Sequence, residues 1–327
     1  MGWNVVLLNN ITNSTILEQR TSSTEYCIIS ADDIEDVPDE IRRYLIIPFI
    51  VFGIISLLSN SLVVLAIIKT RVWENQSTRL ILILSVYDVF DSIITNTSLA
   101  LYISLSENLS CHIKISMVGV SIFLTNSIFS MVAVISFDRL MRVTWMQNYS
   151  TRFNARRYKT VLAIQVILTM LATILWIMGV LSRKPGQAAF YTNLVNIPVY
   201  LATLIFYLVS ICKLAHIQDG SSVATETRKL TKMASIYVLA YFIITSPAIF
   251  FLVFFQRILK DISLWQTSII TFFILYLPNI NGVFNAVMFL LKNRECRRWL
   301  RGVFARWRSR FRRRRVEADN AAPPPAD

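Results

Sequence analysis

The chain has few charged residues and few cysteines for its length. Charged residues make up 16% of its 327 residues, whereas a soluble domain of average composition contains about 25%. Hydrophobic residues make up 54%. This excludes an ordinary soluble fold, and it excludes disorder over most of the chain, because disorder requires low hydrophobicity. Four cysteines are too few for a scaffold held together by disulfides.

The charges that are present are separated along the chain. The formal net charge is +13, which is typical of proteins that bind nucleic acid or an anionic membrane surface. Twelve of the 33 basic residues lie between Lys292 and Arg315, and eight of the 20 acidic residues lie between Glu18 and Glu40. This separation suits a chain whose two ends lie in different compartments.

Seven apolar segments are each near or above the roughly 20 residues that a helix needs to cross a bilayer. They are Tyr44–Ile68, Leu80–Leu105, Ile113–Phe137, Val161–Leu181, Phe190–Leu214, Met233–Phe255 and Leu264–Leu291. They are apolar on nearly every side and no polar scaffold remains to bury them, so we expect them to lie in lipid. The sequence predicts an all-α membrane protein with a seven-transmembrane helix bundle over residues 44–291.

The basic residues predict the orientation of this bundle. With an extracellular N-terminal segment over residues 1–43, 25 of the 33 basic residues fall on the cytoplasmic side, as the positive-inside rule requires. The glycosylation sequons at Asn10, Asn13 and Asn108 then fall outside, where they can be used. We therefore expect a multi-pass protein of the plasma membrane.

The basic segment after the bundle has the pattern of an amphipathic helix over residues 292–312. One face carries Trp299, Leu300, Val303, Phe304, Trp307 and Phe311. Arginines fill the opposite face, so we expect a cytoplasmic helix that lies parallel to the membrane and binds anionic inner-leaflet lipids. The apolar face argues against nucleic acid as the partner. Residues 313–327 are proline-rich at their end, and we expect a disordered tail there.

Polar side chains interrupt several of the apolar segments. They are Asn60, Asp88, Asp91, Asn279, Asn281 and Asn285. An ionisable side chain in hydrocarbon costs at least about 2.5 kcal/mol, which makes Asp88 and Asp91 candidates for a functional site. A carboxylate with several amides in reach can hold a cation or a water network. The alternative is interhelical hydrogen bonding that only stabilises the packing.

Short motifs follow one another in order along these segments. They are Ser59-Asn60-Ser61-Leu62-Val63-Val64, Leu84-Ser85-Val86-Tyr87-Asp88, Ile135-Ser136-Phe137-Asp138-Arg139-Leu140, Asn281-Gly282-Val283-Phe284-Asn285-Ala286-Val287-Met288-Phe289 and Lys292-Asn293-Arg294-Glu295-Cys296. Over Tyr44–Trp299 the chain resembles rhodopsin-like (class A) G-protein-coupled receptors. It departs from their pattern at Leu140 and Phe289, where the family usually has tyrosines, and at Ala286, where it usually has proline.

The resemblance implies roles for individual residues. Asp138 holds Arg139 in the resting state, and Arg139 then meets a heterotrimeric G protein when the sixth helix moves outward. Asn60, Asp88, Asn281 and Asn285 form a sodium and water site; no other cofactor is expected. The remaining coupling residues are Leu140, Tyr207, Pro247, Asn285 and Phe289.

The resemblance also places a ligand pocket in the outer half of the bundle. The candidate residues are Asp91, Ser121, Thr125, Thr245, Ile249, Leu252, Leu275 and Asn279. Ser121 stands where amine receptors have aspartate, and no lysine stands where opsins bind retinal, so both ligand classes are disfavoured. The mostly apolar set with hydroxyls is compatible with a lipid-like or a peptide ligand.

The cysteines differ from the family's usual arrangement. Cys111 resembles the cysteine that opens the third helix, and Cys27 is the only other extracellular cysteine, so we expect a Cys27–Cys111 disulfide. Two free thiols are the alternative. Cys296 stands beside the inner leaflet, where the resemblance implies palmitoylation.

Two other functions remain open at this point. A seven-helix protein could bind its ligand without activating a G protein, as a scavenger does. A transporter or channel could use Asp88 and Asp91 for conduction. Such proteins usually have inverted repeats or broken helices, and neither is evident in the sequence. No enzyme motif is present, and His112 and His216 lie on opposite sides of the membrane, which predicts no histidine metal site.

Overall fold

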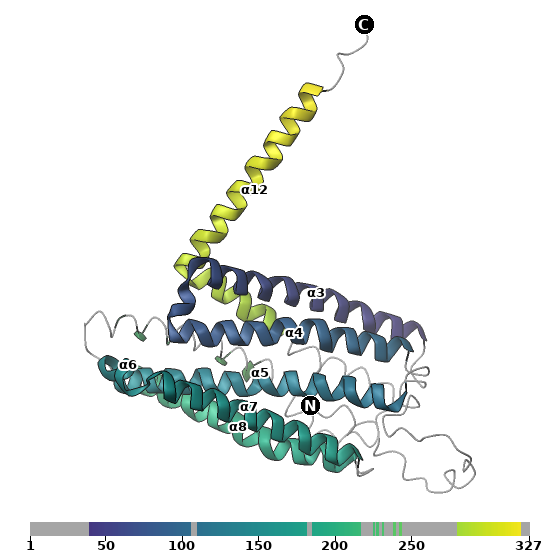
Figure 1. The fold of residues 1–327 in the computed structure, drawn as a ribbon, viewed down its shortest axis with the longest axis vertical. Coiled ribbons are helices and arrows are strands. Elements are labelled where there is room, and N and C mark those ends of the chain that lie inside the picture. Colours follow the sequence, from purple (N-terminus) through teal and green to yellow (C-terminus); the bar gives the residue numbers. More distant parts are fainter. Residues whose placement is uncertain are drawn as a thin grey trace.

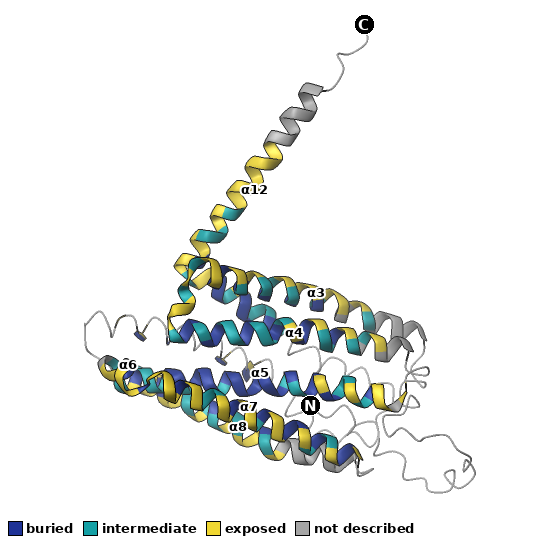
Figure 2. Cartoon of the chain, in the orientation of Figure 1, coloured by how far each residue is buried: buried dark blue, intermediate teal, exposed yellow. Residues whose placement is uncertain are grey.

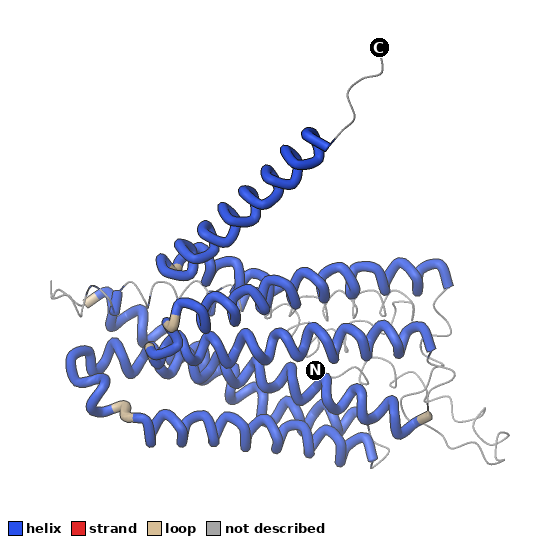
Figure 3. The backbone as a smooth tube through the Cα atoms, turned by 45° about the horizontal axis from the view of Figure 1, so that its top comes forward, coloured by secondary structure: helices blue, strands red, loops and turns tan. Residues whose placement is uncertain are grey.

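The computed structural model describes four long stretches of the chain and a few residues between the third and fourth. The stretches are residues 39–105, 110–181, 185–216 and 280–321. The additional positions are Thr225, Thr227, Arg228, Thr231, Val238, Leu239, Phe242 and Ile243. Within these residues the regular structure is entirely helical (Figure 3).

Five long helices confirm five of the seven predicted segments. They are α3 (Asp39–Thr70), α4 (Gln76–Leu105), α5 (Cys111–Trp145), α7 (Ala155–Leu181) and α8 (Pro185–Ala215). Each contains a stretch long and apolar enough to cross a membrane. The chain is therefore an all-helical membrane protein in the part that the structure describes.

Short elements join or follow these helices. They are η1 (Val72–Glu74), η3 (Met146–Asn148), α6 (Tyr149–Arg152) and a helix over Ile280–Lys292. The long helix α12 (Arg294–Ala321) follows them. Most of the predicted sixth segment and the first part of the seventh lie outside the described residues. The helix Ile280–Lys292 occupies the end of the predicted seventh segment.

Helix α5 lies at the centre of the described bundle. It contacts α4, α7 and α8, and α3 packs on α4 (Figure 1). Figure 2 shows α5 as the most continuously buried of these helices. On its C-terminal half, Leu80 and Leu84 of α4 pack in one cluster with Met131 and Ile135 of α5. Because α5 is covered on several sides, many of the polar residues along it are buried.

The outer helices expose large apolar side chains. Ile54 and Leu58 of α3 are 51% and 60% exposed, and Ile167 and Ile174 of α7 are 64% and 54% exposed. Contiguous apolar surface on this scale is not stable in water. These faces are the ones expected to contact lipid, which agrees with the apolar composition of the same helices.

Close packing of α3 on α4 depends on a glycine. A Cβ atom at Gly53 would lie 3.1 Å from Asn96 Cβ and from Asn96 Nδ2, which is closer than ordinary side-chain contacts. Asn96 is itself tied to its own helix, because its Nδ2 donates to Ser92 O at 3.1 Å. Small residues of this kind let membrane helices approach closely.

We expect Gly53→Ala to destabilise the purified protein by about 1–3 kcal/mol, because the added methyl group overpacks this contact. Thermal unfolding in detergent measures the effect. Gly302→Ala in α12 is the matched control: nothing lies within 4 Å of a Cβ there, so it should be neutral or stabilise the helix by about 0.5–1 kcal/mol. An unfolding temperature for Gly53→Ala equal to that of Gly302→Ala would show that the contact is not tight.

The C-terminal helix is longer than predicted. Helix α12 continues to Ala321, so the prediction of a disordered tail beginning at residue 313 is wrong over residues 313–321. The arginine run and the Val-Glu-Ala-Asp that follows it include strong helix formers. Proline is not tolerated in the interior of a helix. The three consecutive prolines begin only at Pro323, so they do not interrupt the helix.

Candidate functional site

The Asp138–Arg139 pair lies near the C-terminal end of α5 and is buried. Asp138 is 1% exposed and Arg139 is 3% exposed. Arg139 Nη2 lies 3.8 Å from Asp138 Oδ2, which is an ion pair but is longer than a hydrogen bond. Leu140, the next residue of the predicted motif, is only half-buried. The two charged residues are therefore in place, with a loose direct contact.

Two neutral hydroxyl groups hold Asp138 more closely than Arg139 does. Tyr149 of α6 donates its phenol hydrogen to Asp138 Oδ1. Ser77 Oγ at the start of α4 donates to Asp138 Oδ2 at 3.0 Å. These bonds join three separate elements, α4, α5 and α6, at one carboxylate. We refer to Ser77, Asp138, Arg139, Arg142 and Tyr149 as the inner corner.

Arg142 completes the inner corner from one turn further along α5. Its Nη2 donates to Ser77 Oγ at 2.8 Å, which leaves the single hydroxyl hydrogen of Ser77 for Asp138. Its guanidinium lies 4.3 Å from the centroid of the Tyr149 ring, within the range of a cation–π interaction. Arg142 thus positions both of the groups that hold Asp138.

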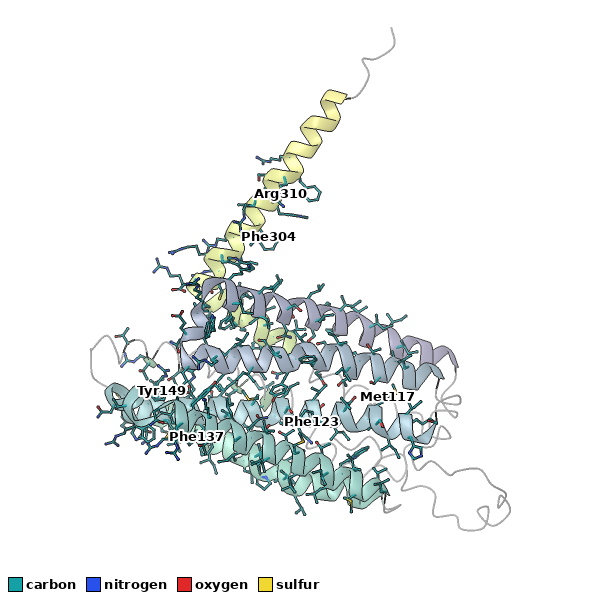
Figure 4. The ribbon with its side chains drawn as sticks, in the orientation of Figure 1. Met117, Phe123, Phe137, Tyr149, Phe304 and Arg310 are labelled. Carbon is teal, nitrogen blue, oxygen red and sulfur yellow. The ribbon has the colours of Figure 1, made fainter. Side chains whose placement is uncertain are left out.

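Tyr149 is placed so that it remains a hydrogen-bond donor. Burial, and after it the nearby Asp138 carboxylate, raise the pKa of the Tyr149 phenol well above its usual range. The phenol therefore stays protonated at physiological pH. In Figure 4 the labelled residues Met117, Phe123 and Phe137 follow α5 towards Tyr149, at the end of the bundle where α12 begins.

The sequence did not identify three members of the inner corner. Ser77 and Arg142 stand 61 and 4 positions from Asp138 in the sequence, and only the fold brings Ser77 beside it. Tyr149 lies 11 positions after Asp138, and no pattern in the sequence marked it as a partner of the carboxylate. Helical spacing could have shown that Arg142 shares the face of Asp138.

A second group of buried polar residues lies deeper in the bundle. Asn60 of α3, Asp88 of α4, and Asn281 and Asn285 of the helix Ile280–Lys292 are all buried. A Cβ atom at Gly282 would lie 3.4 Å from Asp88 Oδ1 and from Ser56 Oγ. The absence of a side chain at Gly282 is therefore what lets this helix approach Asp88 and α3.

Two serines that the sequence analysis passed over connect α3 and α4 beside Asp88. Ser92 Oγ donates to Asp88 O at 2.6 Å, and it lies within hydrogen-bond distance of Ser56 Oγ at 2.8 Å. Asn60 Nδ2 donates to Ser56 O at 3.0 Å. Both serines stand four positions from a predicted polar residue, so a search at helical spacing would have found them.

The oxygen atoms of this group suit a monovalent or divalent hard cation. Asn60 Oδ1, Asp88 Oδ2, Asn281 Oδ1 and Asn285 Oδ1 are buried and have no hydrogen-bond partner within the described residues. Buried acceptors without donors are costly, and carboxylate and amide oxygens are the ligands that hard cations prefer. We call these four residues the central oxygen cluster. No group of three or more His, Cys, Asp or Glu side chains that could hold a metal occurs among the described residues.

Asp91 is buried, but its contacts are local. Its Oδ1 accepts a hydrogen bond from Thr95 Oγ1 of the same helix at 2.6 Å, and its side chain is 7% exposed. The predicted pocket residue Ser121 is also buried and donates to Met117 O at 3.0 Å, within α5. Thr125 is half-buried one turn further on. These three remain pocket candidates.

Several predicted residues lie outside the described part of the chain. They are Asn10, Asn13, Cys27, Asn108, Thr245, Pro247, Ile249, Leu252, Leu275 and Asn279. The Cys27–Cys111 disulfide and the glycosylation sites therefore stay predictions. Tyr207 of α8 is described and half-buried, and it packs on the cluster formed by Phe129, Val132 and Phe242. Phe289 is fully buried against α3.

Polar contacts between helices also occur on α5 at positions that the sequence did not single out. Asn196 Nδ2 of α8 donates to Asn126 Oδ1 of α5 at 3.0 Å. Gln165 Nε2 of α7 donates to Ser130 Oγ of α5 at 2.9 Å. Such bonds contribute about 0.6 kcal/mol on average in membrane proteins. We interpret them as packing contacts.

No model of a known protein family matches this chain. The functional interpretation therefore depends on the residues and contacts described above and on the motif resemblance.

Proposed function

We propose that this protein is a divergent rhodopsin-like G-protein-coupled receptor of the plasma membrane, with its N-terminus outside. The observation that supports this best is the inner corner: Asp138 and Arg139 are buried near the C-terminal end of α5. Ser77 and Tyr149 both donate hydrogen bonds to the Asp138 carboxylate. A carboxylate held in this way can release Arg139 when the elements around it move.

The mechanism is a shift in population between two arrangements. An extracellular ligand that binds the active arrangement more tightly raises its population, and no other coupling is needed. In the resting arrangement Tyr149 and Ser77 keep Asp138 close to Arg139. In the active arrangement the sixth helix moves outward and Arg139 contacts the C-terminal tip of a G-protein α subunit.

The central oxygen cluster would hold a sodium ion. The ion would neutralise the Asp88 carboxylate and satisfy oxygens of Asn60, Asn281 and Asn285 that lack hydrogen-bond donors. Because these residues come from α3, α4 and the helix Ile280–Lys292, binding there favours one arrangement of the three. The extracellular ligand remains a lipid-like molecule or a peptide, with Ser121 and Thr125 as its polar contacts in the described bundle.

The test is nucleotide exchange by purified heterotrimeric G proteins in the presence of the full chain, reconstituted in nanodiscs. A panel of G-protein subtypes is screened without ligand and with lipid and peptide libraries. Exchange above that of empty discs supports the proposal. Ligand binding without exchange on any subtype would identify a scavenger, and ion flux in sealed vesicles would identify a transporter or channel.

We expect Arg139→Ala to lower the stimulated exchange rate by about 30-fold or more, since losing a buried charged contact across an interface costs at least about 2 kcal/mol. Arg156→Ala is the matched control, because Arg156 is an exposed basic residue at the start of α7 on the same side. Equal activity of the two variants, at equal expression, would remove Arg139 from the coupling mechanism.

A further inference from the structure

A buried lysine lies at the N-terminal end of α5. Lys114 is 6% exposed, whereas its neighbours His112 and Ser116 are exposed. Lysine is almost never buried to this extent unless it is paired. In Figure 4 the labelled Met117, less than one turn further along, lies near this end of α5, opposite the end that carries Tyr149. The Lys114 side chain is therefore on the covered side of the helix, away from lipid.

The Lys114 ammonium group has no partner among the described residues. The backbone N–H of Lys114 donates to Ser110 O at 3.1 Å, but no acidic side chain in the described stretches forms an ion pair with its Nζ. The buried carboxylate of Asp91 on α4 accepts a hydrogen bond from Thr95 instead. A buried charge without a partner is costly. The folded chain therefore carries an uncompensated positive charge at this point.

The start of α5 adds to this positive charge. The N-terminus of a helix carries a partial positive charge from its aligned peptide dipoles, which favours anions there and disfavours cations. The first turn of α5 contains no acidic residue, and its N-cap residue, Ser110, makes no hydrogen bond through its side chain. Lys114 thus lies in this first turn without a compensating charge, and an anion bound beside it would be stabilised by both the lysine and the helix end.

Lys114 shares one face of α5 with two of the pocket candidates. Ser121 and Thr125 follow it by seven and eleven positions, which at 3.6 residues per turn places both within about 20° of its direction. Val132 continues the same face 18 positions after Lys114, and it packs in one cluster with Val238. The face therefore looks towards the segment around Val238, and Lys114 is at its N-terminal end.

The chemistry of this face suits an apolar molecule with one anionic group. No charged residue lies between Lys114 and Asp138 in the sequence. The hydroxyl of Ser121 donates its hydrogen to Met117 O, which leaves it only its acceptor capacity. A peptide brings an amide donor and acceptor with each residue, and this face offers few partners for them. A single-chain lipid needs one cation for its head group and apolar contact along the rest.

We propose that Lys114 binds the anionic head group of a single-chain lipid, a carboxylate or a phosphate, whose apolar chain extends along α5 towards Ser121 and Thr125. This inference rests on the proposed function, because it names the class of that receptor's extracellular ligand. The observation that carries it is a buried ammonium group without a partner, on the same face as two pocket candidates. Pairing of Lys114 with an acid of the chain itself is the competing explanation, and it predicts the opposite effect on stability.

The first measurement is thermal unfolding of the purified full chain in a neutral detergent, without added lipid. Lys114→Met removes the charge and keeps an unbranched side chain. We expect it to raise the unfolding temperature by about 2 °C or more, because an unpaired buried charge destabilises the fold. Lys114→Arg keeps the charge and should not raise it. A lower unfolding temperature for Lys114→Met alone would show that an acid of the chain pairs with the lysine, which would overturn the inference.

The second measurement is lipid binding by the full chain in nanodiscs of phosphatidylcholine alone, followed as the rise in unfolding temperature with lipid concentration. Two pairs of probes differ in charge: oleate with oleyl alcohol, and oleoyl lysophosphatidate with monooleoylglycerol. We expect the wild type to bind one of the anions at least about 30-fold more tightly than its neutral counterpart. Lys114→Met should lose this preference, and Lys114→Arg should retain it. The preferred pair distinguishes a carboxylate from a phosphate.

His112→Met is the matched control, because His112 is exposed at the same end of α5 and the variant should bind like the wild type. Equal binding of charged and neutral lipids by the wild type would overturn the inference. So would a loss of preference in His112→Met as large as in Lys114→Met, which would indicate diffuse attraction to this end of the bundle. An acidic peptide that stabilises the wild type but not Lys114→Met, with no effect of either anionic lipid, would identify a peptide as the ligand.

Failure of the receptor proposal can be told apart from failure of this inference. Anion binding that requires Lys114, without nucleotide exchange on any G protein, would support the lipid site and remove the coupling. Exchange stimulated by a neutral lipid, and unchanged in Lys114→Met, would support the receptor and overturn the lipid site.

Discussion

Asp138→Asn is expected to raise nucleotide exchange in the absence of ligand by about 10-fold or more. The carboxylate accepts hydrogen bonds from Tyr149 and Ser77 and lies 3.8 Å from Arg139. Hydrogen bonds to a charged group contribute about 1.5–3 kcal/mol each, and asparagine loses the charge while keeping the shape. The resting arrangement is then less favoured, and Arg139 is released more often.

Tyr149→Phe is the matched comparison. It removes one hydrogen bond but keeps the ring beneath the Arg142 guanidinium, so its effect on unliganded exchange should have the same direction and be smaller. Both variants are measured in nanodiscs at equal receptor density. A decrease in unliganded exchange with Asp138→Asn would mean that Asp138 supports the active arrangement, contrary to the mechanism proposed here.

Asp88→Asn is expected to abolish stabilisation of the purified protein by sodium. Asp88 is the one carboxylate in the central oxygen cluster, so it provides the full negative charge that a cation needs there. A ligand that binds only the folded state raises its stability in proportion to the logarithm of ligand concentration. Each kcal/mol raises the unfolding temperature of a protein of this size by about 2–4 °C.

The measurement compares thermal unfolding in sodium chloride and in choline chloride at equal ionic strength. Asp91→Asn is the matched control, because Asp91 lies one turn away on the same helix and its contact is with Thr95. The wild type and Asp91→Asn should unfold at a higher temperature in sodium, and Asp88→Asn should not. Loss of the sodium effect in both variants would point to a diffuse electrostatic effect.

The position of five membrane helices could be read from composition, although each helix extends beyond the segment that was predicted. Segments of more than about 20 apolar residues have few other stable environments, and the predicted segments fall within α3, α4, α5, α7 and α8. The Asp138–Arg139 motif near the C-terminal end of α5 and the four residues of the central oxygen cluster were candidate site residues in the sequence, and the structure shows that they are buried. Ionisable residues are rare in such helices, so those that occur are conspicuous.

The partners of these residues could not be identified in the same way. Ser77 and Tyr149 reach Asp138 from α4 and α6, and serine at a helix start or tyrosine in a short connection is common in any sequence. Gly282 matters because of what lies opposite it, which is Asp88 and Ser56. Contacts between distant parts of the chain depend on helix rotation and crossing, which periodicity within one helix does not specify.

Helix α12 has one property that the sequence predicts and another that only the packing of the helices decides. Its amphipathic pattern follows from residue spacing, because apolar side chains three and four positions apart share a face whatever the helix packs against. Whether a particular residue on that face is covered depends on where the helix leaves the bundle: Cys296 is enclosed by α3, while Trp307, eleven positions later, is exposed. The spacing of apolar residues along the chain therefore determined which face each helix can bury. The packing of the helices determined which neighbouring helix covers that face.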